Sequence, residues 1–177
     1  MLITKQRTRL AKTKNKSMNY SFDYDNTLIK YKGIRDSEGN LIDVVYDGPH
    51  YENISILREL ADEGHTIYII TSRIQYDPID FKFDWDTSPL PQETVRNLKL
   101  PVEAIIYTNG RKKLEKLLLH RIKKHWDDDV KECEEIFKYN NLSYPKSVGH
   151  QIECCLVDVE EGLTVGLREK FMRLAKL

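Results

Sequence analysis

Short apolar runs alternate with amphipathic helical patterns along most of this 177-residue chain. Four of these apolar runs predict β-strands, at residues 19–23, 65–70, 102–107 and 151–157. Three of them are dense in Ile, Val, Tyr or Leu, as strands buried on both faces of a parallel sheet must be. This alternation predicts an α/β fold, with a Rossmann-like parallel sheet and helices on both faces.

The segments between the runs carry apolar residues at helical spacing. Ile54, Leu57 and Leu60 repeat three residues apart, and the pattern stops at Gly64, a common helix terminator. Further helices are predicted over residues 114–118, 130–137 and 163–177. Two segments break the alternation. Residues 28–34 and 41–45 flank a Ser-Glu-Gly-Asn turn and predict a β-hairpin, whereas residues 74–91 predict a long irregular loop.

The first 17 residues carry six Lys or Arg and no acid, and the composition changes at Met18. We therefore expect a flexible basic tail over residues 1–17 and a single domain over residues 18–177. The tail is either solvated or contacts a phosphate backbone. Over the whole chain, 28 Lys and Arg balance 28 Asp and Glu, so net charge gives no reason to expect a polyanionic partner.

The cysteines and the hydropathy indicate a cytoplasmic protein. Cys133, Cys154 and Cys155 form no CxxC pair and are odd in number, which favours a reducing compartment over a disulfide framework. No apolar run approaches the ~20 residues of a membrane span, and the start lacks the apolar stretch of a secretory signal.

Chemically active side chains stand where the predicted strands end. Because ligands of open parallel sheets bind beyond the carboxyl ends of the strands, these positions define the expected site. They are Asp23-Tyr24-Asp25-Asn26-Thr27 after the first strand, Thr71-Ser72-Arg73 after the second, Lys112 and Lys113 after the third, and Asp127-Asp128-Asp129 after a polar run at 122–126.

This set of groups suits phosphoryl transfer. Clustered carboxylates repel one another unless a cation sits among them, and hard oxygen ligands suit Mg²⁺. A carboxylate can attack phosphorus, and a second one nearby can protonate the leaving group. A hydroxyl and an ammonium can hold the phosphoryl oxygens.

The sequence FDYDNTL, then a strand ending in Thr71, then Lys113 and an acid cluster, resembles the haloacid dehalogenase (HAD) superfamily of phosphatases. The resemblance covers residues 18–139, with residues 151–157 fitting a further strand. It implies a HAD-type fold in which the hairpin is a flap over the site. It also implies a compact member with no large cap domain and an open site.

The resemblance implies a role for each residue. Asp23 is the nucleophile that becomes aspartyl-phosphate, and Asp25 is the general acid and base. Thr71 binds the phosphoryl group, and Lys113, favoured by spacing over Lys112, neutralises charge. The implied Mg²⁺ ligands are Asp23, Asp25 through its main-chain carbonyl, and Asp127 and Asp128. Asp128 is the favoured direct ligand of the last pair. The implied substrate-binding residues are Thr27, which also braces the loop, Ser72, Arg73 and Lys112.

Two departures from the family pattern stand out. The strand before the acid cluster, RIKKHW, is unusually polar for a central position, and Asn26 replaces the commoner Gly. Asp129 is expected to cap the following helix.

The predicted function is a phosphomonoester hydrolase that acts on a nucleotide or a nucleic-acid 3′-phosphate. Side chains of the loop either stack on a base or form a packed aromatic cluster, and a set of basic residues is either a rim that attracts the polyanion or a solvated face. The loop residues are Tyr76, Phe81, Phe83 and Trp85, and the rim residues are Arg111, Lys116, Lys123 and Lys124. The alternatives are a phospho-accepting receiver-like domain and a catalytically idle binding protein of the same fold.

Overall fold

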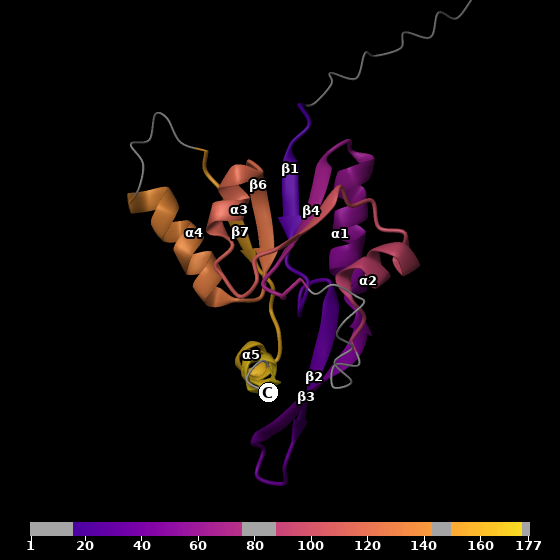
Figure 1. The fold of residues 1–177 in the computed structure, drawn as a ribbon, viewed down its shortest axis with the longest axis vertical. Coiled ribbons are helices and arrows are strands. Elements are labelled where there is room, and N and C mark those ends of the chain that lie inside the picture. The colour runs from indigo at the N-terminus through magenta and orange to yellow at the C-terminus, as the bar shows by residue number, and fades with distance from the viewer. Residues whose placement is uncertain (1–15, 76–87, 143–149, 175–177) are drawn as a thin grey trace, which may run out of the picture.

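A parallel five-stranded sheet forms the centre of the molecule in the computed structural model, which describes residues 16–75, 88–142 and 150–174 (Figure 1). Its strands are β1 (Asn19–Phe22), β4 (Thr66–Thr71), β5 (Ala104–Tyr107), β6 (Ile122–Asp127) and β7 (Glu153–Leu156). They lie in the order β5-β4-β1-β6-β7, and each neighbouring pair is parallel. All five carboxyl ends therefore meet at one edge.

Helices cover both faces of this sheet, as the alternation predicts. They are α1 (Tyr51–Asp62), α2 (Pro91–Leu98), α3 (Leu114–Leu119) and α4 (Val130–Leu142), whereas the last helix, α5 (Leu163–Leu174), does not lie on a face of the sheet. Neighbouring residues of β4 point to opposite faces. Ile69 packs in one core cluster with Leu57 of α1, whereas Ile70 packs in a second cluster with Leu117 of α3 and Ile136 of α4.

The predicted hairpin is present as the antiparallel pair β2 (Ile29–Arg35) and β3 (Leu41–Pro49). Helix α5 packs against it beneath the carboxyl edge of the sheet (Figure 1). Leu41 fits between Gly33 and Gly166, since a Cβ on either glycine would lie 2.6 Å from a Leu41 methyl group. The Lys170 ammonium donates to the Val44 carbonyl at 2.6 Å. The hairpin and α5 thus form one layer below the sheet.

Helix α2 departs from the sequence pattern, which predicts an irregular loop over residues 74–91 and no helix after it. Its sequence PQETVRNL is short and polar, with Val95 and Leu98 as its large apolar residues. The missed signals are local: Pro91 stands at the first helical position, and the Glu93 carboxylate accepts the Leu90 N–H at 2.9 Å. The stacking residues Tyr76, Phe81, Phe83 and Trp85, and most of the basic tail, lie outside the described residues.

The polar strand β6 lies inside the sheet, between β1 and β7. Its exposed Lys123 and half-buried Lys124 belong to its first half. Lys124 pairs with Glu153 at 2.7 Å, and its ammonium lies 5.1 Å from the centre of the Trp126 ring.

Within the described ranges, no helix is long and apolar enough to span a membrane.

The expectation of a chain without disulfides is wrong in this structure. Cys133 of α4 and Cys154 of β7 form a disulfide, with Cα atoms 5.6 Å apart, and Cys155 is free. The cysteines lie 21 residues apart in sequence, so only the packing of α4 on β7 brings them together.

We expect reduction of this disulfide to lower the free energy of unfolding by about 2–4 kcal/mol, because the cross-link restricts the unfolded chain. Chemical denaturation with and without reductant measures the effect. Cys155→Ser should keep the full reductant effect, and Cys133→Ser should abolish it. A reductant effect that survives in Cys133→Ser would contradict the cross-link.

Candidate functional site

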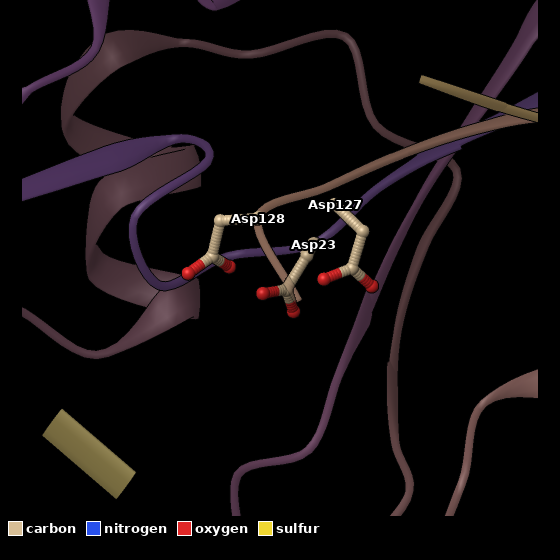
Figure 2. A group of neighbouring side chains, drawn as sticks. All are labelled: Asp23, Asp127 and Asp128. Carbon is tan, nitrogen blue, oxygen red and sulfur yellow. The ribbon is translucent and has the colours of Figure 1, made fainter. Parts of the chain in front are cut away.

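Three carboxylates meet at the carboxyl edge of the sheet, between β1 and β6 (Figure 2). Asp23 follows β1, Asp127 ends β6 and Asp128 comes next. One oxygen of each lies within 4.8 Å of the others, and all three residues are buried. Counted along the sheet alone, the strand order is 3-2-1-4-5, so the cluster stands where the order reverses, the usual ligand position in such sheets.

The Lys113 ammonium joins two of these carboxylates. Its Nζ lies 2.8 Å from Asp23 Oδ1 and 2.7 Å from Asp127 Oδ2. Burial by itself would lower the pKa of Lys113, but Asp127 and Asp23 raise it above its usual value. Lys113 is therefore charged. Its neighbour Lys112 is exposed and pairs with Glu135 at 2.7 Å instead.

The three acids have different electrostatic environments. Burial raises the pKa of Asp23 well above its usual range, opposed by Lys113 and reinforced by Asp127 and Asp128. Burial would also raise the pKa of Asp127, but Lys113 and His125 lower it below its usual range. Burial and the Asp127 charge raise the pKa of Asp128 to about 6. Without a cation, the cluster holds more negative charge than one ammonium can offset.

Side chains within the sheet hold the Asp127 carboxylate in position. His125 is fully buried, with Nε2 2.9 Å from Asp127 Oδ2 and Nδ1 2.8 Å from Ser21 Oγ. Since a carboxylate only accepts, Nε2 carries the proton and the Ser21 hydroxyl donates to Nδ1. The Asp129 N–H donates to Asp127 Oδ1 at 2.9 Å. Both Asp127 oxygens thus have partners in the protein.

Asp128 is fixed at one oxygen only. Its Oδ2 accepts hydrogen bonds from Asn26 Nδ2 at 2.9 Å and from the Thr164 hydroxyl of α5 at 2.6 Å. No hydrogen bond to Oδ1 is found among the described residues, which leaves that oxygen for a cation. Asp129 accepts the Lys131 N–H at 3.0 Å at the start of α4, as expected of a cap, and also pairs with Arg168.

Asp25 stands apart from the three-carboxylate cluster, so its side chain is not gathered with the predicted metal ligands. The Arg73 guanidinium donates two hydrogen bonds to the Asp25 carboxylate, from Nη2 to Oδ1 at 2.7 Å and from Nε to Oδ2 at 2.9 Å. The Tyr31 hydroxyl also donates to Asp25 Oδ1, at 2.9 Å. The guanidinium lies 4.8 Å from the centre of the Tyr24 ring and 5.7 Å from that of Phe171. Arg73 thus contacts a predicted catalytic residue.

The predicted hydroxyl residues differ in position. Thr71 is fully buried at the end of β4, and its Oγ1 accepts the Arg73 N–H at 3.2 Å. Thr27 is also fully buried, and its carbonyl accepts from Asn53 at 2.8 Å, a contact that fits a bracing role. Ser72 is exposed. Although the sequence predicts an open site, Asp23, Asp25 and Lys113 are each less than a tenth exposed.

The sequence does not predict the roles of several residues that surround the site. Asn26, Ser21 and His125 stand beside predicted catalytic positions, and a buried His in an otherwise polar strand was the available signal. Thr164 gave no signal, because α5 is 36 residues from Asp128 in the chain.

No protein-family model matches this chain, and no curated protein matches its sequence. The HAD resemblance therefore stays a prediction.

We expect Asp128→Asn to raise the free energy of unfolding by about 1–3 kcal/mol at pH 7.5 in chelator, because it removes a buried charge near Asp127. Asn retains an oxygen that can accept from Asn26 and Thr164. Since the folded-state pKa of Asp128, about 6, exceeds the unfolded value, wild-type stability should fall as pH rises from about 4 through 6. In Asp128→Asn this fall should be shallower, as denaturation at several pH values will measure.

The matched control is Asp62→Asn, an exposed change at the end of α1 that should alter neither quantity. Millimolar Mg²⁺ should raise the melting temperature of the wild type and of Asp62→Asn but not of Asp128→Asn. A wild type that does not respond to divalent cations would exclude a metal site here.

Proposed function

We propose that this protein is a Mg²⁺-dependent phosphomonoester hydrolase in which Asp23 forms an aspartyl-phosphate. The observation that carries the proposal is the buried Lys113 ammonium, held between Asp23 and Asp127 beside a third carboxylate at the ligand-binding edge of the sheet. Electrostatic stabilisation of this kind is what phosphoryl transfer chiefly requires.

The side chains divide the reaction between them. An Asp23 oxygen attacks phosphorus, the bond from phosphorus to the ester oxygen breaks, and Asp25 supplies the proton that the departing alkoxide takes up. Asp25 then accepts a proton from the water that hydrolyses the aspartyl-phosphate, releasing phosphate and restoring the Asp23 carboxylate. Lys113 and the Thr71 hydroxyl stabilise the phosphoryl oxygens.

Arg73 links substrate binding to the acid. The guanidinium pairs with Asp25 in the structure, and phosphoryl oxygens are equally suited to its bidentate geometry. A bound phosphate dianion competes for Arg73 and so frees Asp25 to hold the proton that the leaving group needs.

The acids fit a magnesium ion, which would be held by Asp23 and Asp128, with the Asp25 carbonyl as a further oxygen ligand. When bound, Mg²⁺ supplies positive charge that favours phosphate binding and offsets charge on the phosphoryl group. Asp127 is better suited to fixing Lys113, because both of its oxygens already accept hydrogen bonds.

The strand order counts against the receiver alternative. Receiver domains have the flavodoxin-like order 2-1-3-4-5, whereas the parallel strands here follow 3-2-1-4-5. A catalytically idle binding protein remains as an outcome of the tests: it would bind Mg²⁺ without turnover.

We expect Asp23→Asn to lower kcat/KM for an aryl phosphate by about 10³-fold or more, because it removes the attacking oxygen and keeps the side-chain shape. Asp62→Asn serves again as the matched control. Steady-state hydrolysis with Mg²⁺ measures both variants, and circular dichroism checks their folding. Near-normal turnover by folded Asp23→Asn would contradict the covalent mechanism.

The proposed substrate is a nucleotide or a nucleic-acid phosphate end. Arg111 follows β5 at the site edge, whereas Lys123 and Lys124 lie in the first half of β6, away from that edge. Only part of the predicted basic rim therefore borders the site. Residues 16–17, the described part of the basic tail, precede β1 at the opposite edge.

A 3′-phosphorylated oligonucleotide should be hydrolysed more efficiently than a mononucleotide at low salt, because each Lys or Arg that neutralises a phosphate releases a counterion. This advantage should shrink at high salt and again when residues 1–17 are removed. Comparing kcat/KM for both substrates at two ionic strengths measures the effect. A salt-independent preference for the mononucleotide would exclude the polynucleotide and retain the phosphatase.

A further inference from the structure

Asn26 lies in the turn after β1 with its side-chain amide at the acid cluster. The residue is 2% exposed, and its Nδ2 donates to Asp128 Oδ2 at 2.9 Å. Its amide oxygen, Oδ1, is also buried and accepts no hydrogen bond within the part of the chain that the structure describes. A buried amide oxygen without a donor is costly and uncommon in folded proteins.

The orientation of this amide is dictated by Asp128. If the amide were rotated by half a turn, Oδ1 would face the Asp128 carboxylate, and two acceptors would be in contact. The NH₂ group must therefore point to Asp128, which leaves Oδ1 unpartnered beside the cluster. The unsatisfied oxygen is a consequence of holding Asp128 in place.

The backbone alone does not explain an asparagine at this position. Asn26 has φ +55°, in the left-handed region, where glycine carries no penalty and Asn is better tolerated than most residues. Glycine would satisfy the turn without introducing a buried unpaired oxygen. The side chain must therefore contribute something beyond the turn.

We propose that Asn26 is a positioning residue for cation binding. Its NH₂ group holds Asp128 with Oδ1 of that carboxylate left for the ion. Its own amide oxygen gains a donor only when the ion enters with its hydration shell. This inference rests on the cation of the proposed function, and it assigns to Asn26 a part of the affinity for that cation. Mg²⁺ characteristically retains several of its waters, so acceptors around the ion strengthen binding.

The test is a Mg²⁺ titration of the full chain, followed by the melting temperature. Asn26→Gly keeps the left-handed turn and removes the amide, so the variant should fold. We expect the Mg²⁺ concentration for half-maximal stabilisation to rise about 10-fold or more, as for other residues that orient metal ligands. Without Mg²⁺, the melting temperature of the variant checks that it folds, because losing the hydrogen bond to Asp128 and losing the unpaired oxygen have opposite effects on stability.

The matched control is Lys99→Gly. Lys99 is an exposed residue at φ +50° after α2, so the change makes the same backbone substitution away from the site. It should leave the Mg²⁺ midpoint unchanged. A merely structural Asn26 would leave the Mg²⁺ midpoint of Asn26→Gly unchanged, and that result would overturn the proposal whatever the melting temperature without Mg²⁺.

A second variant separates the contribution of the amide oxygen to Mg²⁺ affinity from that of the NH₂ group, which donates to Asp128. Thr164→Val removes the other donor to Asp128 Oδ2 and leaves Asn26 intact. If the amide oxygen contributes, Asn26→Gly should shift the midpoint more than Thr164→Val does, and equal shifts would overturn that contribution. A normal Mg²⁺ response without phosphatase activity would reject the proposed function and keep the role of Asn26. A wild type that does not respond to Mg²⁺ would overturn both.

Discussion

The buried ammonium of Lys113 is the interaction on which the arrangement of the site depends. It contacts Asp23 and Asp127 at 2.8 and 2.7 Å and makes their burial at the sheet edge possible. Removing one partner of a buried charge pair leaves the other charge buried and uncompensated. Because one ammonium cannot balance three carboxylates, the cluster could hold a metal ion.

The polar character of β6 follows from this interaction. An apolar strand would fill the sheet equally well but could not hold Asp127. Ser21 and His125 form a buried chain of hydrogen bonds that ends on the Asp127 carboxylate. The polar residues of β6, which are unusual in a central strand, thus hold the site residue Asp127 in position.

The C-terminal helix α5 completes the site from a distant part of the chain. Thr164 contacts Asp128, Arg168 contacts Asp129 and Lys170 contacts β3, so one helix ties the acids to the hairpin. Phe171 also lies near the guanidinium of Arg73. These contacts fix α5 against the acids and the hairpin at the carboxyl edge of the sheet.

The sequence by itself determined most of the alternation of strands and helices, with α2 as the exception, together with the hairpin and the residues at the strand ends, because these depend on local patterns of apolar and polar residues. Asp23, Lys113, Asp127 and Asp128 were predicted together, since parallel strands necessarily bring their carboxyl ends to one edge. Only the tertiary structure decided the partners of such residues: Lys113 contacts both Asp23 and Asp127, Arg73 contacts Asp25, Thr164 contacts Asp128, and Cys133 bonds to Cys154. Such contacts join positions far apart in the chain and depend on how helices pack on the sheet, which no local pattern records.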